Sequence, residues 1–158
     1  MKSTVHRRAF IAATTIAIPS IAIAGRLPRQ GSMEQMDFHD LMKQIGKSYK
    51  AMRSPMRSLD TEDQWETASF YANEMTILLA QAIAAAEQVD IASQSKSDYD
   101  GDKEAYANAL RNNLADTAIA TLTLSKALWN KDSDTAKSTF GKLRLARNDG
   151  HAQFQEDD

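Results

Sequence analysis

The 158-residue sequence contains no cysteine, only three prolines and six glycines, and few aromatic residues. Without cysteine the chain has no disulfide, no thiolate nucleophile and no cysteine-linked lipid anchor, so its stability has to come from packing. Proline and glycine are the residues that most often interrupt helices. Ala, Leu, Met, Lys, Gln and Glu, which favour helices, are by contrast plentiful. The composition therefore predicts an all-α protein.

Several residue arrangements that carry catalytic or binding chemistry are also missing. The sequence has no Ser/His/Asp arrangement, no glycine-rich phosphate loop and no pair of Glu-x-x-His motifs of the kind found in di-iron bundles. The acidic cluster at 98–102 lacks the glutamate that completes a calcium-binding loop, so it indicates a solvated turn and a helix cap. We therefore expect that the protein is not an enzyme.

Residues 1–24 have the pattern of an export signal. Three basic residues precede an apolar run from 9 to 24, which is too short and too rich in small residues for a membrane span. Ala22-Ile23-Ala24 ends the run with the small-x-small pattern of a signal-peptidase site. Arg7-Arg8 followed by Phe10 resembles a twin-arginine signal, although His6 stands where that motif usually has Ser or Thr. The pattern predicts export to the periplasm, by either the general or the twin-arginine route.

The predicted mature chain is acidic. Without Lys2, Arg7 and Arg8 the basic side chains fall from 19 to 16 against 21 acidic ones, a net charge of −5. Such a balance argues against nucleic acid or an anionic membrane surface as a partner. After removal of the signal no membrane span is expected. Residues 25–32 are predicted to be a disordered lead, and the oligomeric state is left open, with a homodimer as one option.

Residues 33–158 contain four segments with helical periodicity. The first runs from about residue 33 to the break at Ser54-Pro55, and the second from a cap at Asp60 or Thr61 to about residue 89. The third spans about 103 to 129, and the fourth begins at a cap at Asp132 or Ser133. In the first three segments one stripe is predicted to face inward. It consists of Phe38, Leu41, Met42, Ile45, Tyr49 and Met52 in the first, Trp65, Ala68, Ala72, Met75, Leu79, Ala82 and Ala86 in the second, and Tyr106, Leu110, Leu114, Thr117, Thr121, Leu124 and Leu128 in the third. Residues 91–102 are predicted to be a polar loop. Short connections inside the first and second helix pairs predict an antiparallel up-down-up-down four-helix bundle.

The last predicted helix carries a histidine near its end. Its stripe predicts that His151 points inward. This stripe consists of Phe140, Leu143, Arg147, Gly150, His151 and Phe154. In the predicted topology the start of the first helix and the end of the last share one end of the bundle. Met42, roughly 12–14 Å into the first helix at 1.5 Å per residue, can therefore face His151. A thioether sulfur and an imidazole nitrogen across an apolar interior are the ligand pair of a six-coordinate haem iron.

The C-terminal residues Arg147-Asn148-Asp149-Gly150-His151 and Ala152-Gln153-Phe154 resemble the end of the four-helix-bundle cytochromes c′ and b562. Members with covalent haem carry Cys-x-x-Cys-His there, and Arg147 and Gly150 occupy the two cysteine positions. Cytochrome b562 has an Arg-Asn-x-x-His version without covalent attachment, which this chain matches, and a methionine ligand early in its first helix, for which Met42 is the match.

The resemblance implies a single non-covalent haem b in a bundle that covers residues 33–158. It implies that Met42 and His151 are the axial ligands, that Arg147 is available to pair with a haem propionate, and that Ile45 and Phe154 are apolar neighbours of the haem. It also implies one-electron transfer with a periplasmic redox partner protein.

Three alternatives stay open at this point. His39, one turn before Met42, is a rival ligand that would give bis-histidine ligation or a small metal site with His151. A haem-free bundle would use Met42 as core filler and His151 as a cation at the helix C-terminus. A five-coordinate haem, open on the Met42 side, would bind small gases. Gly150 is expected to leave room for a flat ligand beside His151.

Overall fold

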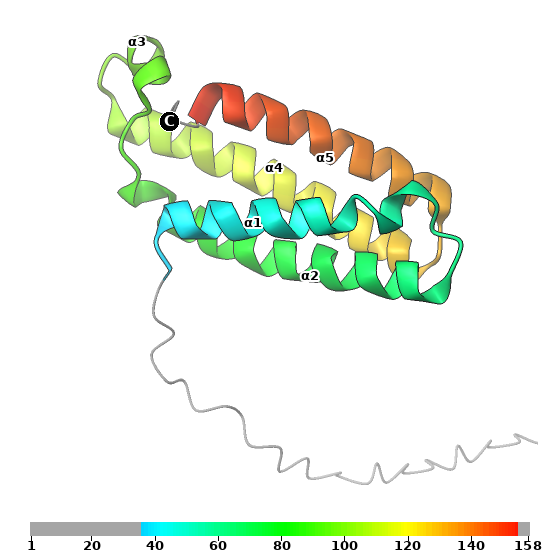
Figure 1. Cartoon of the computed structure of the whole chain (residues 1–158). Coiled ribbons are helices and arrows are strands. Elements are labelled where there is room, and N and C mark those ends of the chain that lie inside the picture. The colour runs from blue at the N-terminus through cyan, green and yellow to red at the C-terminus, as the bar shows by residue number, and fades with distance from the viewer. Residues whose placement is uncertain (1–35, 155–158) are drawn as a thin grey trace, which may run out of the picture. The chain divides into compact units, whose positions relative to one another are not determined.

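Capping residues and apolar stripes divide the chain into the helices seen in Figure 1. The computed structural model describes residues 36–154, which fall within one compact unit and contain no strand. The helices are α1 (Phe38–Met52), α2 (Glu62–Ala85), α3 (Lys96–Tyr99), α4 (Lys103–Trp129) and α5 (Ser133–Phe154), with short 3-10 turns η1 (Pro55–Arg57), η2 (Ala86–Gln88) and η3 (Ser93–Ser95). The prediction of an all-α chain is confirmed for these residues. The predicted export signal (1–24) and polar lead (25–32) lie outside the described residues.

Each long helix begins at a side chain that caps its first turn. Asp37 accepts a hydrogen bond from the backbone of residue 40, and Asp102 and Asp132 do the same for the first turns of α4 and α5. Thr61 forms a capping box with Gln64 before α2. These bonds satisfy N–H groups that a helix leaves without intrahelical partners. The predicted caps at residues 61 and 132 are therefore confirmed, whereas α1 begins at Phe38, later than the predicted start near residue 33.

The predicted apolar stripes of the first three long helices form the core. On α4 every predicted inward residue is buried: Tyr106, Leu110, Leu114, Thr117, Thr121, Leu124 and Leu128. On α2 the small residues Ala68, Ala72 and Ala82 are fully buried, so neighbouring helices approach closely there. Leu41, Ile45, Tyr49 and Met52 are the buried apolar residues of α1. The 3.6-residue period of the sequence thus identified most of the interior correctly.

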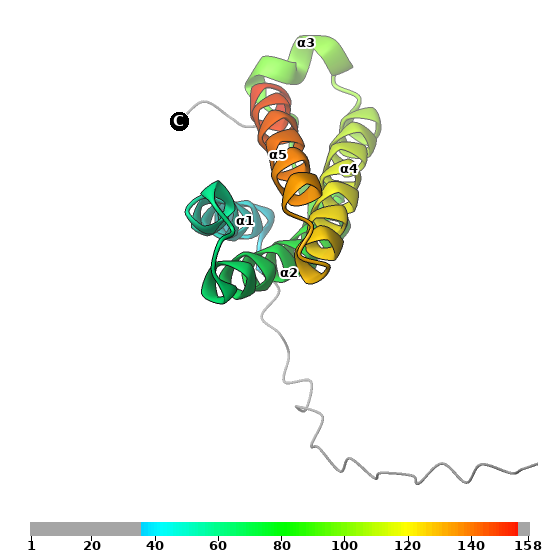
Figure 2. The ribbon, with the colours of Figure 1, turned by 90° about the vertical axis from the view of Figure 1, so that its right-hand side faces the viewer.

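Side-chain contacts set the order in which the helices pack. α1 packs on α2, α2 on α4, and α4 on α5. Lys131, just after α4, pairs with Glu62 at the start of α2, and Arg111, in the third turn of α4, pairs with Glu87, just after α2. Figure 2 shows a gap between the ribbons of α1 and α5. Among the described residues, these two helices lack the close backbone approach of the other three pairs.

The predicted polar loop between α2 and α4 is more ordered than expected. It contains η3 and α3, and Ile91, Ala92 and Ser95 within it are buried. Asp100 and Gly101, both with positive φ (46° and 80°), end α3 and turn the chain into α4. The prediction of a purely polar loop was incomplete, because three of its small or apolar residues are buried against the helices, which composition alone does not reveal.

No single helix in the described range is long and apolar enough to cross a membrane. The segments Glu62–Gln88 and Ser93–Tyr99 meet that criterion only together, as a pair bent by 61°.

Candidate functional site

Aromatic side chains bridge α1 and α5. The ring of Tyr49 on α1 stacks on that of Phe140 on α5, with centroids 5.1 Å apart and an interplanar angle of 18°. The guanidinium carbon of Arg147, two turns further along α5, lies 5.6 Å from the centroid of the same Tyr49 ring. A cation over a tyrosine face is attracted by the ring quadrupole. One tyrosine therefore joins α1 to two levels of α5.

The predicted ligand Met42 shares the Tyr49 side of α1. It lies seven residues, or two turns, before Tyr49, and both therefore lie on the same face of the helix. Met42 is half-buried and packs against the core cluster, while Ile45, between the two, is buried. Met42 thus lies at the edge of the core, on the side of α1 that carries Tyr49.

His151 does not turn into the interior as its stripe predicts. Its side chain is exposed, in the last turn of α5, one turn beyond Arg147. The prediction of an inward-pointing histidine was wrong because 140, 143, 147, 150 and 154 take the side facing the rest of the bundle, and 151 falls at the edge of that stripe. Partial desolvation, with the nearby positive charge of Arg147 as the second cause, lowers the pKa of His151. The lowered pKa favours the neutral imidazole, the form that can bind a metal ion.

Gly150 lies against α4 and not beside an open space. A Cβ built on Gly150 would be 3.0 Å from Oδ1 of Asn113. The expectation that this glycine leaves room for a flat ligand beside His151 was therefore wrong on this side of the helix, because the side chain of Asn113 occupies the room. Gly150 serves the close approach of α5 to α4.

The C-terminal turn of α5 is held by the segment between α2 and α4. The hydroxyl of Ser95, which is buried, donates to the backbone carbonyl of Gln153, and the Gln153 side-chain amide donates to Oη of Tyr99 at 2.9 Å. The ring of Phe154 packs edge-on to Tyr106, 5.5 Å between centroids, and Tyr99 packs edge-on to Tyr106 at 5.2 Å. Phe154 thus lies in an aromatic cluster that anchors the end of the helix carrying His151.

Sequence reasoning missed this anchor. The only available signal was the alternation of serines with a lone tyrosine in a stretch that otherwise reads as a polar loop. Ser95 and Tyr99 are 58 and 54 residues from Gln153. No local periodicity links positions so far apart.

The described residues provide no set of ligands for the alternative of a small metal site at His39 and His151. His39 is exposed at the start of α1. Within residues 36–154 no group of three His, Cys, Asp or Glu side chains is placed to hold a metal ion. Zinc, which histidine commonly binds, takes three or four ligands from the protein. A site built from His39 and His151 alone would therefore be incomplete.

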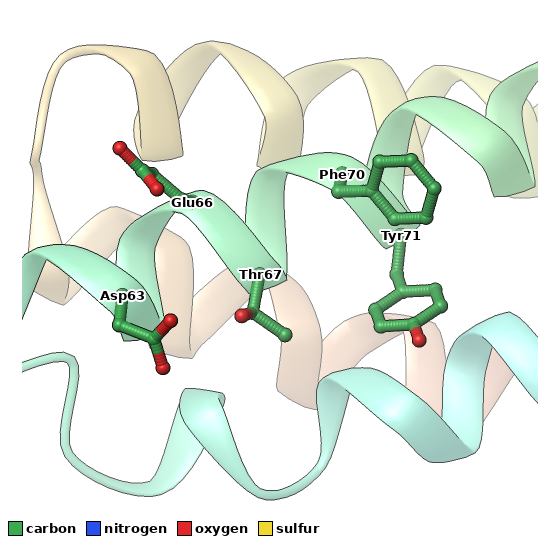
Figure 3. Close-up of a pocket in the computed structure, with 5 residues that line it drawn as sticks. All are labelled: Asp63, Glu66, Thr67, Phe70 and Tyr71. Carbon is green, nitrogen blue, oxygen red and sulfur yellow. The ribbon is translucent and has the colours of Figure 1, made fainter.

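A shallow surface depression lies on α2, away from these residues (Figure 3). It is lined by Asp63, Glu66, Thr67, Phe70 and Tyr71. All five come from the first three turns of α2, so the depression follows one helix and joins no two distant parts of the chain. It adds no residue to the site between α1 and α5.

Comparison of the chain with protein-family models, with curated proteins and with solved structures found no match.

Proposed function

We propose that the chain is an antiparallel up-down-up-down four-helix bundle of the cytochrome b562 type. In this proposal Met42 and His151 would hold the iron of one non-covalent haem b where α1 and α5 face each other, and the protein would transfer electrons in the periplasm. The observation that carries the proposal is the stacking of Tyr49 on Phe140, because it sets the register between the two helices that bear the ligands.

The register supports the proposal because the two proposed ligand residues come to a similar level. Tyr49 contacts both Phe140 and Arg147, so it lies level with that stretch of α5. Met42 is seven residues before Tyr49, about 10 Å along α1 at 1.5 Å per residue. His151 is four residues after Arg147 and eleven after Phe140, about 6 to 16 Å along α5. In antiparallel helices these displacements run in one direction, so Met42 and His151 come within about 6 Å of a common level.

The residues present fit the proposed cofactor chemically. α1 and α5 meet through side chains, whereas the other three helix pairs approach closely along their backbones. A flat group would therefore displace the least backbone between α1 and α5. The lowered pKa of His151 favours the neutral imidazole that an iron ligand requires. Arg147, half-buried beside Tyr49, is placed to pair with a carboxylate such as a haem propionate. Haem supplies the one-electron exchange, and a methionine–histidine pair raises its potential.

The protein's own contribution is ligand choice, burial and nearby charge. Met42 and Ile45 offer the apolar wall on α1, and the exposure of His151 keeps the site at the surface of the bundle. A surface site suits electron transfer to a partner protein through a small, weak contact. No catalytic residue is assigned. The periplasmic location rests on the sequence of residues 1–24.

Titration of the purified protein with hemin tests the proposal. We expect a stoichiometric change in the Soret absorption, with a reduced spectrum typical of a low-spin iron. His151→Ala should abolish that spectrum while leaving the helical circular dichroism intact. Met42→Ala should convert the iron to a high-spin form.

Two control variants separate ligation from general effects. His39→Ala removes an exposed histidine of α1, and Met36→Ala removes a nearby exposed methionine; both should leave the spectrum unchanged. Absence of any Soret change with hemin would overturn the haem proposal. A high-spin spectrum already in the unaltered protein, unchanged in Met42→Ala, would replace it with a five-coordinate, gas-binding form. A low-spin spectrum that survives in Met42→Ala would remove Met42 from its role as a ligand.

A haem-free periplasmic module is the second candidate. Two observations favour it: His151 is exposed, and Asn113 fills the space beside Gly150. In that case the Tyr49, Phe140 and Arg147 contacts would serve only to close the bundle. Calorimetric titration that finds no hemin binding, together with an unaltered thermal transition in the presence of hemin, is the result that selects this candidate.

A further inference from the structure

Five large apolar side chains are exposed on α2 and α4. Each has between 52% and 63% of its surface open to solvent. They are Phe70 and Ile77 on α2, and Ile119, Leu122 and Trp129 on α4. Only two other large apolar residues are exposed in the described range, Met36 before α1 and Leu145 on α5. The exposed apolar surface is therefore concentrated on two adjacent helices.

The spacing of these residues places them on the outer sides of their helices. Phe70 and Ile77 are seven residues apart, and exposed Ala80 and Ala84 continue the same strip of α2. On α4, Trp129 is seven residues after Leu122 and eighteen after Arg111, so it shares a side with the arginine that pairs with α2. We call Phe70, Ile77, Ile119, Leu122 and Trp129 the α2–α4 surface. A gathering of exposed large apolar residues on two adjacent helices is typical of an interaction site.

The exposed apolar residues of α2 and those of α4 lie at matching positions along the two helix axes. The pairs Glu62 with Lys131 and Glu87 with Arg111 fix how α2 lies along α4. With that alignment Ile77 is level with Ile119, Phe70 lies between Leu122 and Trp129, and the first turns of α2 are level with Trp129. Phe70 and Ile77 of α2 therefore each lie level with exposed apolar residues of α4, and the exposed polar Asn73 and Glu74 lie between them on α2.

The charges on the α2 side of this surface are opposite to those on its α4 side, so two copies of the surface can pair. The α2 side begins with acidic residues, including the exposed Glu66, and the α4 side carries the exposed Lys126 one turn from both Leu122 and Trp129. A rotation of 180° about an axis parallel to the helices lays α2 of one copy on α4 of another without changing levels. Glu66 then meets Lys126 of the second copy, and Ile77 meets Ile119. Such an isologous contact closes after two copies.

We propose that the α2–α4 surface is the interface of a homodimer in which α2 of each protomer packs on α4 of the other. The five side chains supply roughly 500–600 Å² per copy, given that large side chains bury about 150–250 Å² each when fully covered. A standard interface needs about 800 Å² per partner, and the alanines and flanking polar residues of the same strips provide the remainder. The proposal is independent of haem, since α1 and α5 lie outside this surface.

Sedimentation equilibrium of the purified protein, with and without hemin, tests the dimer. We expect a mass twice that of the 17.5 kDa chain at micromolar concentration. Leu122→Glu should shift the protein to monomer by placing a carboxylate at the centre of the contact. Leu145→Glu is the matched control, since it changes an equally exposed leucine on α5 and should leave the dimer intact.

A charge exchange tests the arrangement itself. Glu66→Lys should weaken dimerisation by about two- to thirtyfold, counting two symmetric surface pairs. Adding Lys126→Glu in the same chain should restore it. In the variant Trp65→Phe, where Trp129 is the remaining tryptophan, the emission maximum should move to shorter wavelength as concentration rises.

A monomer at all concentrations up to about 100 µM would overturn the proposal, because interfaces of standard size bind more tightly than that. A dimer that survives Leu122→Glu with circular dichroism unchanged would show that another surface is used. A dimer that loses affinity in Glu66→Lys and is not restored by Lys126→Glu would contradict the α2-on-α4 arrangement.

Discussion

The ring of Tyr49 on α1 stacks on that of Phe140 on α5, 5.1 Å between centroids, and Arg147 covers the same tyrosine. These contacts, 91 and 98 residues apart in the sequence, join the first and the last long helix. They decide how the two helices are aligned along each other. The testable consequences concern stability, the end of α5 and the titration of His151.

Removal of the Tyr49 ring should destabilise the fold. Tyr49→Ala deletes a buried aromatic side chain, and we expect it to lower the free energy of unfolding by about 3 kcal/mol. Tyr49→Phe keeps the ring and should cost less than about 1 kcal/mol. Urea denaturation followed by circular dichroism measures both. Equal losses in the two variants would show that the hydroxyl, and not the ring stack, is what matters.

The contact between Arg147 and Tyr49 should appear as a coupling energy. In a double-mutant cycle with Tyr49→Leu and Arg147→Gln, the cation–π contact predicts a coupling of about 0.5–1 kcal/mol. The cycle is measured by urea denaturation at low and high salt. Lys142→Gln, a change of an exposed cation on the same helix, is the control and should show no coupling to Tyr49. Additive single changes would contradict a direct contact.

Gly150→Ala tests the approach of α5 to α4. Alanine favours the helix by about 1 kcal/mol over glycine, but its Cβ would lie 3.0 Å from Oδ1 of Asn113. We therefore expect little net change in the single variant and a gain of about 1 kcal/mol from the added Cβ in an Asn113→Ala background. Thermal unfolding of the four proteins separates the two effects. A full gain already in the single variant would show that Asn113 moves aside without cost.

The anchor of the last turn of α5 should control its fraying. Tyr99→Phe removes the acceptor of the Gln153 amide, and Ser95→Ala removes the donor to the Gln153 carbonyl. Each change should cost about 0.5–1.5 kcal/mol and speed amide exchange in residues 150–154. Ser93→Ala, an exposed serine of the same segment, is the control. If haem binding also weakens in Tyr99→Phe, the anchor positions His151 as well as the helix end.

The lowered pKa of His151 predicts a pH dependence of stability. Because the pKa is lower in the folded chain than the ordinary value of about 6.5, the unfolded chain binds more protons between the two values. The contribution of His151 to the free energy of unfolding is therefore fully present above about pH 6.5 and is lost as the pH falls through the pKa of the folded chain. The effect is small because the side chain is exposed.

His151→Gln should flatten this part of the pH profile, whereas His39→Gln should leave it unchanged. NMR titration of the imidazole protons gives the pKa directly. In Arg147→Gln the pKa of His151 should rise, since one of the two causes of its lowering is removed. A pKa at or above 6.5 in the unaltered protein would contradict the desolvation on which the prediction rests.

The helices were predictable because their determinants are local. Caps such as Thr61 and Asp132, and apolar stripes such as that of α4, act through neighbours three or four residues away. The segment from 91 to 102 was read as a loop because its order comes from distant residues. Buried Ser95 bonds Gln153, and Tyr99 packs on Tyr106. The order of this segment therefore depends on residues of α4 and α5.

The candidate site was predictable only in part. Met42 and Tyr49 were placed on one face of α1 from spacing, and Arg147 on the bundle side of α5, as the structure has them. His151 was predicted to point inward but is exposed, because spacing alone does not show which edge of a helical stripe another helix covers. At the edge of a stripe, coverage depends on where the neighbouring helix lies. Here the neighbour is α4, which meets Gly150 through Asn113 and leaves His151 exposed.

By itself, the sequence determined the all-α character of the described chain, the boundaries of its long helices to within about five residues, and most of the residues that form its core. Those properties follow from local propensity, capping and the 3.6-residue period. Tertiary structure alone decided the contact of Tyr49 with Phe140 and Arg147, the anchoring of the last turn of α5, and the apolar surface on α2 and α4. These depend on which helices meet and at what level, and such long-range packing leaves no periodic trace in the chain.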